Sequence, residues 1–392
     1  MLFKFLSVVW ALPLVITMRL LNKFILIKMA TLQTNRIGGL ILQSLKYLRF
    51  SHASKREILL FGSESNVISN NYWMMLLKRS GLNIVGNWLY YLIFWNSLLP
   101  NSQKYKVENQ NFILFENRDW SFDYAKLIQF TGEENLEGLR WLRKHGLASG
   151  QPFICLLSRD SAYLSPQQVF HKKNLYDYHD YRNTSIHTFD LTIKWLIKNG
   201  YFVIRMGSKV NDRISLKDGN FVDYPFCNDS SPFLDIWLFA NCYFTISTGT
   251  GQDVISPIFK KPLLCINVLP LCHTSGLYIS TYVPKKLFDM KSKIPLSIEE
   301  YFYHSYSRDE DYDKNSILIQ NLNEFEILEY VQEFEKNVKN GFWVKANTSM
   351  LQEEIWNLYK SKSQDKVLLK DKNPQALFSE IWISRNILRK KT

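Results

Sequence analysis

The chain has 392 residues, a length that favours two domains over one. With 46% hydrophobic and 21% charged residues it can bury large cores, which excludes a disordered, collagen-like or low-complexity protein. The formal net charge of +12 favours anionic partners such as phosphate groups, anionic lipid or nucleic acid.

The chain begins with an apolar stretch that predicts a helix at a membrane surface. Residues 5–18 are apolar but include Pro13 and end at Arg19, so the run is shorter than the ~20 residues of a spanning helix. Arg19, Lys23 and Lys28 stand among bulky apolar residues, a pattern that suits a helix lying on an anionic membrane. A spanning signal anchor and a soluble packed helix are the alternatives.

The next part of the chain predicts strands and helices in turn. Residues 56–61 read as a buried strand, and residues 71–78 read as a helix with one apolar face. The aromatic stretch at 81–100 predicts a core helix or, alternatively, a face against lipid, because no charged residue interrupts it. Thr131 and Glu134 have the spacing of a capping box at the start of another helix.

The second half of the chain has a regular alternation of strands and helices. Strands are expected at 153–157, 201–206, 221–223, 242–247 and 263–267, with helices at 186–197, at 232–240 and from about 252 between them. This alternation predicts a parallel sheet with helices on both faces. Ligands of such sheets bind at the carboxyl ends of the strands, so polar residues at those positions are candidate site residues.

The strongest candidate is a glycine-containing loop that follows one strand and precedes a helix. It consists of Ser247, Thr248, Gly249, Thr250 and Gly251. Glycines let a phosphate approach the backbone, and N–H groups at a helix start point toward it. A tight turn with a helix cap is the alternative. A dinucleotide fingerprint is disfavoured, because Val254 stands where its third glycine is required.

Other polar residues stand at or near the same ends of the strands. They are Arg159, Asp160, Tyr181, Arg182, Asn183, Arg205, Gly207, Asp223, Tyr224, Asp235 and Asn267. Arginine side chains can clamp a diphosphate through two parallel hydrogen bonds, and carboxylates can accept hydrogen bonds from sugar hydroxyls. The alternative for Arg159 and Arg205 is an ion pair with Asp160 or Asp223.

The cysteines and the other acidic residues predict no metal site. The five cysteines lack C-x-x-C spacing and several stand in apolar runs, so we expect reduced and mostly buried thiols. Cys272 and His273 form a pair without further ligands. Asp309, Asp311 and Asp313 have the spacing of a metal-binding Asp-x-Asp motif, but no strand precedes them and a solvated loop is expected.

The ordered set of short motifs resembles a family of bacterial glycosyltransferases found in surface-carbohydrate gene clusters. The matching segments are 157–163, 181–183, 200–207, 223–224, Asp235, 247–251, and Lys261-Pro262 ahead of Asn267. Residues 36–38 match the opening loop of the family, with Gly39 where a histidine is more usual. The family looks related to two-domain GT-B enzymes, in which a nucleotide-sugar lies between two Rossmann-like lobes.

The resemblance implies an α/β protein with two Rossmann-like lobes and an N-terminal apolar helix. The expected division is a membrane-associating segment at 1–30, an acceptor lobe at 31–148, a donor lobe at 149–340 and a helical extension at 341–392. The implied partners are a nucleotide-sugar donor, a glycan or lipid-linked acceptor and the cytoplasmic face of the membrane. No cofactor or metal is expected, since the nucleotide-sugar is a substrate.

The predicted activity is transfer of a sugar to a surface glycan, with the catalytic base in the first lobe. Glu64 is the candidate base, because it follows a predicted strand; Glu116 and Asp119 are its rivals. A non-catalytic membrane-associated carbohydrate-binding protein is the alternative. Nucleic acid is not an expected partner, since the basic residues are dispersed and no nucleic-acid-binding motif is present.

Overall fold

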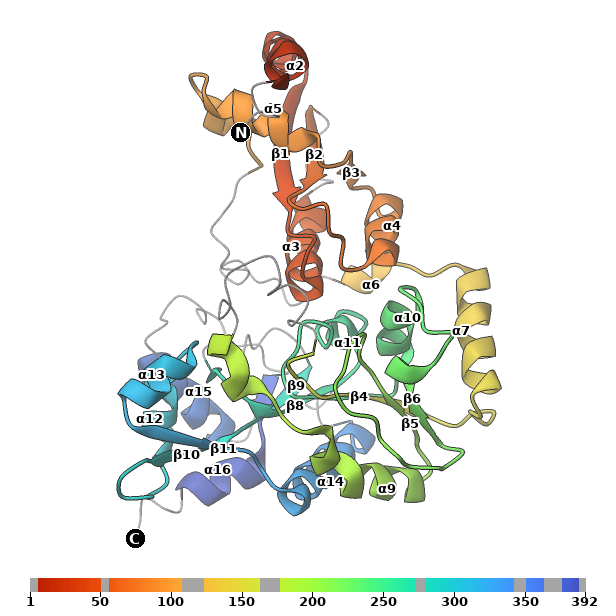
Figure 1. The fold of residues 1–392 in the computed structure, drawn as a ribbon, viewed down its shortest axis with the longest axis vertical. Coiled ribbons are helices and arrows are strands. Elements are labelled where there is room, and N and C mark those ends of the chain that lie inside the picture. The colour runs from red at the N-terminus through yellow and green to blue at the C-terminus, as the bar shows by residue number, and fades with distance from the viewer. Residues whose placement is uncertain are drawn as a thin grey trace. The chain divides into compact units, whose positions relative to one another are not determined.

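The structure is a computed structural model that describes residues 6–50, 56–107, 123–162, 177–271, 279–341, 350–362 and 376–387 (Figure 1). The described residues before Thr131 form one compact unit, here unit 1, and those from Thr131 onward form unit 2. Each unit contains a parallel sheet flanked by helices. The predicted fold class, α/β with two Rossmann-like units, is therefore confirmed.

Unit 1 is built on a three-stranded parallel sheet. Its strands β1 (Leu26–Leu32), β2 (Glu57–Ser63) and β3 (Asn83–Ile84) lie in chain order, and α3 (Ile37–Phe50) and α4 (Asn71–Arg79) connect them. The predicted strand at 56–61 and helix at 71–78 are confirmed. β1 was not predicted, because Lys28 interrupts its apolar run; the ammonium group pairs with Glu57 at 2.8 Å on the neighbouring strand.

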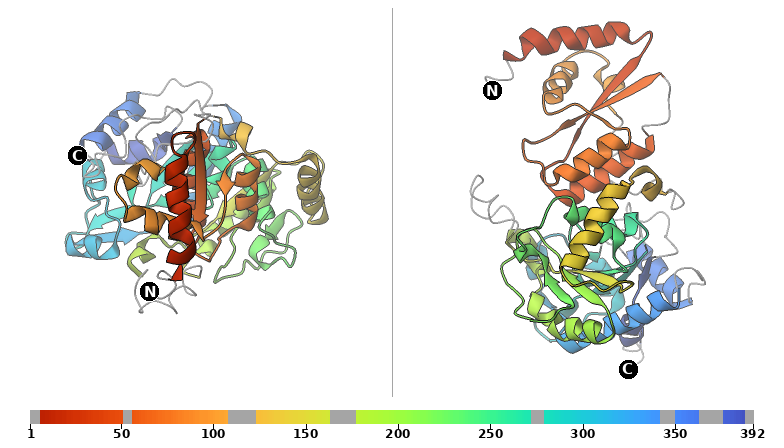
Figure 2. Two further views of the ribbon diagram at one scale, coloured as in Figure 1. Left: turned by 90° about the horizontal axis from the view of Figure 1, so that it is seen from above. Right: turned by 90° about the vertical axis from the view of Figure 1, so that its right-hand side faces the viewer.

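Two apolar helices, α2 (Val8–Leu21) and α5 (Leu89–Ser97), pack together beside this sheet (Figure 2). Ala11 and Val15 of α2 are buried against Leu89 and Leu92 of α5. Short elements η1 (Ser102–Tyr105) and α6 (Tyr124–Leu127) complete unit 1. Within the described residues, none of the helices combines the length and the apolar character needed to cross a membrane.

Unit 2 is built on a seven-stranded parallel sheet. The strands are β4 (Phe153–Leu157), β5 (Phe202–Arg205), β6 (Phe221–Asp223), β7 (Thr245–Ser247), β8 (Leu263–Val268), β9 (Ser280–Pro284) and β12 (Ala376–Phe378). Their order across the sheet is β12-β9-β8-β7-β4-β5-β6. The chain thus proceeds from β4 toward one edge, returns to place β7 beside β4, and then proceeds toward the other edge. This is a doubly wound topology, and all five strands predicted for the second half are confirmed.

Helices cover both faces of the large sheet (Figures 1 and 2). On one face lie α9 (Asp190–Lys198) and α14 (Glu324–Lys339); on the other lie α10 (Leu234–Asn241) and the short α11 (Ile255–Ile258). The turns between them include η2 (Asp177–Arg182), η3 (Ile186–Phe189) and η4 (Tyr224–Phe226). The predicted alternation of strand and helix is confirmed.

Helix α7 (Gly132–Lys144) opens unit 2 and packs against α10. Its predicted capping box is confirmed: Thr131 accepts from the N–H of Glu134, whose carboxylate accepts from the N–H of Thr131. A Cβ on Gly138 would lie 2.3 Å from the ring of Trp237, so the glycine permits the two helices to approach closely. The compact units therefore divide after Phe130, whereas the sequence placed a domain boundary near 148.

The C-terminal part of the chain completes unit 2. An antiparallel pair, β10 (Lys286–Asp289) and β11 (Ile317–Gln320), lies with α12 (Ile298–Tyr303) and α13 (Asp309–Lys314). Beyond them come α15 (Met350–Lys362), β12 and α16 (Glu380–Ile387), with Trp356 and Phe378 buried in the core of the unit. Because β12 joins the large sheet, the described residues after 341 are an integral part of unit 2.

Candidate functional site

The candidate site lies at the carboxyl ends of β4 and β7, where the strand order reverses. At this position the chain after β4 turns toward one edge of the sheet and the chain after β7 turns toward the other, the arrangement at which open α/β sheets commonly bind their ligands. The N–H of Thr248 donates to the carbonyl of Leu157 at 3.1 Å, and the N–H of Arg159 donates to the Thr248 hydroxyl at 2.8 Å. The loops after the two strands are thus held side by side at the carboxyl ends of β4 and β7, here called the switch point because the strand order reverses there.

The loop at 247–251 is organised around a buried carboxylate, Asp253. One oxygen of Asp253 accepts from the Ser247 hydroxyl at 2.6 Å and from the Thr250 N–H at 2.7 Å. Burial raises the pKa of Asp253 to about 6, although these hydrogen bonds and Arg182 oppose the shift. The N–H of Gly249 donates to the Ser247 hydroxyl at 3.2 Å. Two loop amides expected to bind phosphate thus already have acceptors, the Ser247 hydroxyl and the Asp253 carboxylate.

Three cationic side chains from separate segments, Arg159, Arg182 and Lys285, form a group beside the loop. Arg182 donates from Nη2 to the carbonyl of Gly249 at 2.7 Å. Lys285, which follows β9, is only 2% exposed and donates from Nζ to the carbonyl of Asn183 at 2.7 Å. Burial, together with the charges of Arg182 and Arg159, lowers the pKa of Lys285 to about 7. Three cationic side chains therefore lie close enough to influence one another, an arrangement that favours an anionic ligand.

A carboxylate from α13 holds the turn that carries Arg182. Asp309 accepts from the N–H of Tyr181 at 3.0 Å and from the N–H of Asp180 at 3.2 Å. The ring of Tyr181 is buried, with its centroid 5.3 Å from that of Tyr312, so it packs within the protein. The expectation of a solvated loop at Asp309 is wrong, because this residue begins a helix and binds two backbone amides.

Arg205 and Asp223 form an ion pair on β5 and β6. Nη1 of Arg205 lies 3.0 Å from Oδ1 of Asp223 and 2.6 Å from the carbonyl of Asp212, and the arginine is 1% exposed. Asp223 also accepts from the N–H of Ile214 at 2.9 Å. The sequence analysis gave this ion pair as the alternative to diphosphate binding by Arg205. Gly207 follows with a φ of 142°, a conformation that favours glycine.

The other predicted residues of unit 2 hold loops in place. The Tyr224 hydroxyl donates to Asp235 at 2.9 Å, and burial raises the pKa of Asp235 to about 6. Asp160 accepts from the N–H of Asn211 at 2.9 Å. Asn267 is fully buried, has a φ of 54° and accepts from the N–H of Leu322 at 2.9 Å.

Glu64, the candidate catalytic base, belongs to unit 1. It follows β2 directly, its N–H donates to the carbonyl of Leu32 at 2.9 Å, and its side chain is exposed. Glu116, Asp119, Cys272 and His273 lie outside the described residues. The four described cysteines are free thiols, three of them buried, as the sequence predicts.

Lys285, Asp253 and Asp309 are the residues of the candidate site that the sequence analysis missed. Lys285 follows a strand, as Arg159 and Arg205 stand at or near strand ends. The rule that ligands bind at the carboxyl ends of the strands could therefore have found it. Asp253 stands two residues after the glycine-containing loop, within reach of its amides. Nothing in the local sequence connects Asp309 with Tyr181, which lies 128 residues away.

Comparisons with known proteins add little to this geometry. No protein-family model and no curated protein matches the sequence. One solved structure similar to the chain is the ADP-heptose LPS heptosyltransferase II of E. coli, with 13% sequence identity and a TM-score of 0.34. The match covers 61% of this chain and 84% of that one. A similarity of this size carries no information on the reaction or the substrate of this chain.

Proposed function

We propose that the protein is a glycosyltransferase that binds the diphosphate of a nucleotide-sugar at the switch point of unit 2. The observation that carries the proposal is a group of cations beside the loop at 247–251: Arg182 donates to the carbonyl of Gly249, and the buried Lys285 lies close enough to Arg182 and Arg159 to respond to their charges. A diphosphate brings two negative charges, which would compensate the mutual repulsion of these cations. The same charges would stabilise the diphosphate as it leaves the sugar.

The proposed reaction is attack of an acceptor hydroxyl on the anomeric carbon of the donor. The bond from that carbon to the acceptor oxygen forms while its bond to the diphosphate breaks, and a base takes the hydroxyl proton. We propose Glu64 as this base, since it is an exposed carboxylate at the carboxyl end of a strand in unit 1. The proposed acceptor is a glycan, either free or linked to a lipid.

The proposed function is tested by donor binding and turnover with matched lysine variants. Lys285→Met should weaken binding of the correct nucleotide-sugar by about tenfold or more, since a charged hydrogen bond contributes roughly 1.5–3 kcal/mol. Lys286→Met is the control, because Lys286 pairs with Glu326 at 2.7 Å on the protein surface. Equal affinities in both variants would contradict the proposed site. Binding without turnover would instead identify a carbohydrate-binding protein.

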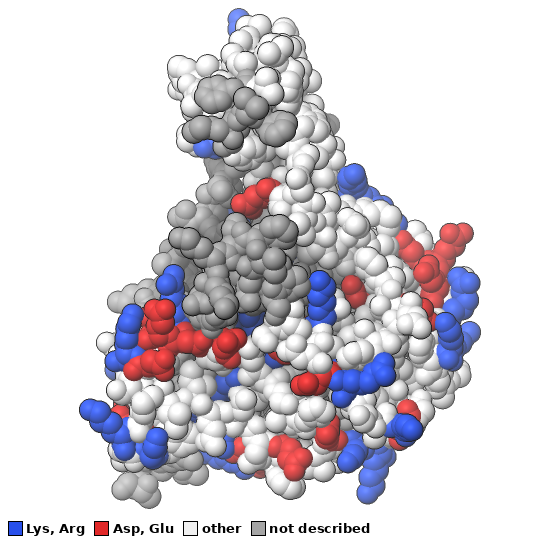
Figure 3. All heavy atoms as spheres, in the orientation of Figure 1, with Lys and Arg blue, Asp and Glu red and all other residues white. Residues whose placement is uncertain are grey.

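We also propose that unit 1 docks on the cytoplasmic face of the membrane, where a lipid-linked acceptor would be available. Exposed apolar side chains support this proposal: Val9, Leu20 and Phe24 are 78%, 72% and 76% exposed. The part of unit 1 that faces the viewer in Figure 3 carries few charged side chains. Such a surface suits insertion into the interface between lipid headgroups and acyl chains.

A further inference from the structure

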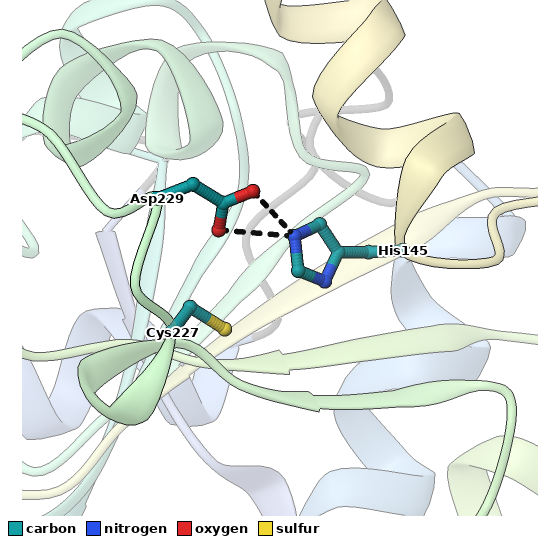
Figure 4. A group of neighbouring side chains, drawn as sticks. All are labelled: His145, Cys227 and Asp229. Atoms are coloured by element: carbon teal, nitrogen blue, oxygen red, sulfur yellow. Dashed lines mark hydrogen bonds and ion pairs between the residues drawn. The ribbon is translucent and has the colours of Figure 1, made fainter.

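His145, Cys227 and Asp229 form a compact group of metal-binding side chains in unit 2, separate from the residues of the switch point. Their ligand atoms all lie within 4.8 Å of one another, and each residue is half-buried (Figure 4). The histidine comes from the end of α7, whereas the thiol and the carboxylate come from the loop after η4. The three side chains point toward a common space between these two segments.

The local structure holds each of the three side chains near this space. The N–H of His145 donates to the carbonyl of Trp141 at 3.1 Å, and the imidazole packs on the Trp141 ring with a centroid distance of 4.2 Å. The N–H of Cys227 donates to the carbonyl of Tyr224 at 3.0 Å, at the end of η4. Nε2 of His145 already lies 3.1 Å from Oδ2 and 3.2 Å from Oδ1 of Asp229.

The charges of the group suit a cation. Metal binding uses deprotonated ligands, and a carboxylate together with a thiolate supplies two negative charges to a divalent cation. Lys144 contacts Oδ2 at 2.7 Å and is itself largely exposed, which leaves Oδ1 as the oxygen without a lysine contact.

We propose that Nε2 of His145, Sγ of Cys227 and Oδ1 of Asp229 bind one zinc ion or a similar divalent transition metal. Nitrogen, sulfur and oxygen donors together suit zinc, whereas magnesium and calcium take oxygen ligands. Atoms bound to one tetrahedral zinc lie roughly 3.4–3.7 Å apart. The 3.2 Å between Nε2 and Oδ1 must therefore open slightly, whereas separations of up to 4.8 Å within the group must close by about 1 Å. Three protein ligands leave the fourth position of the metal to water.

Binding exchanges protons for the metal. The zinc–sulfur bond forms as the Cys227 thiol loses its proton to solvent. The neutral imidazole of His145 moves its proton from Nε2 to Nδ1 through solvent, which frees the Nε2 lone pair for the metal. Lys144 keeps its hydrogen bond to Oδ2 and orients the bound carboxylate from outside. The metal would tie the end of α7 to the loop after η4, two segments far apart in the sequence.

The proposal is tested by titrating cobalt(II) into full-length protein that carries no histidine tag and has been treated with a chelator. We expect a thiolate-to-cobalt charge-transfer band in the near ultraviolet that one equivalent of zinc removes. Cys227→Ser should abolish the band. His145→Gln should weaken cobalt binding by more than about 100-fold, because loss of a residue that only hydrogen-bonds to a metal ligand already changes affinity roughly 10–100-fold. His187→Gln is the control, because His187 also pairs with an aspartate, Asp190 at 3.7 Å, but does not belong to the proposed metal site.

Two results would overturn the assignment: the absence of a charge-transfer band in the parent protein, or the same band in Cys227→Ser. Circular dichroism establishes that each variant is folded. If Cys227→Ser does not fold, His145→Gln decides, because unchanged cobalt affinity in that variant is incompatible with Nε2 as a ligand. The outcome is independent of the proposed donor site, since none of the three residues contributes to it.

Discussion

Lys285 is the residue of the switch point whose charge depends most strongly on its surroundings. Its ammonium group donates to the carbonyl of Asn183 and is almost completely buried. Burial disfavours the charged form, and the nearby guanidinium groups of Arg182 and Arg159 disfavour it further, whereas the carboxylate of Asp309 favours it. A bound diphosphate would act in the opposite direction and restore the positive charge.

This coupling predicts that donor binding weakens as the pH rises through about 7. The pKa of Lys285 is about 7 in the unliganded protein, so at higher pH the ligand must bind together with a proton. Affinity for the nucleotide-sugar should fall by roughly 30-fold between pH 6 and pH 8.5, while Lys285→Met should show a flat profile. The diphosphate of a nucleotide-sugar is esterified at both ends and keeps its charge over this range. Isothermal titration at several pH values provides the measurement, and a flat profile in the parent would contradict the coupling.

Arg205 and Asp223 illustrate a different role for charged residues at strand ends. Because both partners are largely buried, removal of the arginine leaves a carboxylate without its ion pair. Arg205→Met should lower the free energy of unfolding by about 3–5 kcal/mol. We expect the folded fraction to bind the donor as well as the parent does. Urea denaturation measures the first effect and titration the second; unchanged stability with lost donor binding would place Arg205 in the donor site instead.

At the scale of elements, α2 combines a buried face with an exposed apolar face. Ala11 and Val15 are fully buried against α5, whereas Leu20 and the following Phe24 are more than 70% exposed. The cations expected to attract an anionic membrane are partly engaged within the protein. Arg19 donates to Asn96 at 2.9 Å and to the carbonyl of Pro100, and Lys28 pairs with Glu57.

Membrane docking should therefore depend on the apolar face more than on charge. Leu20→Glu combined with Phe24→Glu should greatly reduce binding to anionic liposomes in a sedimentation assay. High salt should have only a small effect, since Lys23, the exposed cation between Leu20 and Phe24, contributes about 1 kcal/mol. The matched control is Ile294→Glu with Phe325→Glu, which changes two similarly exposed apolar residues in unit 2. Equal loss of binding in both double variants would contradict docking through α2.

At the scale of the whole molecule, the sequence predicted the fold more completely than the site. The core strands β4, β5 and β8 are short apolar runs between turn residues, and such runs are visible in a sequence. β12 and β9 were not predicted, although both are buried strands of the same sheet. In the site, Arg182 and Gly249 were found through their position after regular elements. Their partners Lys285 and Asp309 depend on how distant segments pack, which local patterns do not contain.

The position of β12 predicts that unit 2 requires its C-terminal residues in order to fold. A chain that ends at residue 341, near the predicted domain boundary at 340, would lose the buried side chains of Trp356, Tyr359 and Phe378. Removing even one large buried aromatic side chain costs about 3–5 kcal/mol, whereas a typical domain is stable by about 5–15 kcal/mol.

The truncation would also leave the edge of β9 without a neighbouring strand on that side and expose the carbonyl of Leu271, to which the Tyr359 hydroxyl now donates at 2.7 Å. We therefore expect the chain ending at residue 341 to be insoluble or to lack a cooperative thermal transition. A chain ending at residue 387 keeps every described element and should unfold cooperatively, like the parent. A cooperative transition in the shorter chain, followed by differential scanning calorimetry, would show instead that α15, β12 and α16 are dispensable to the core of unit 2.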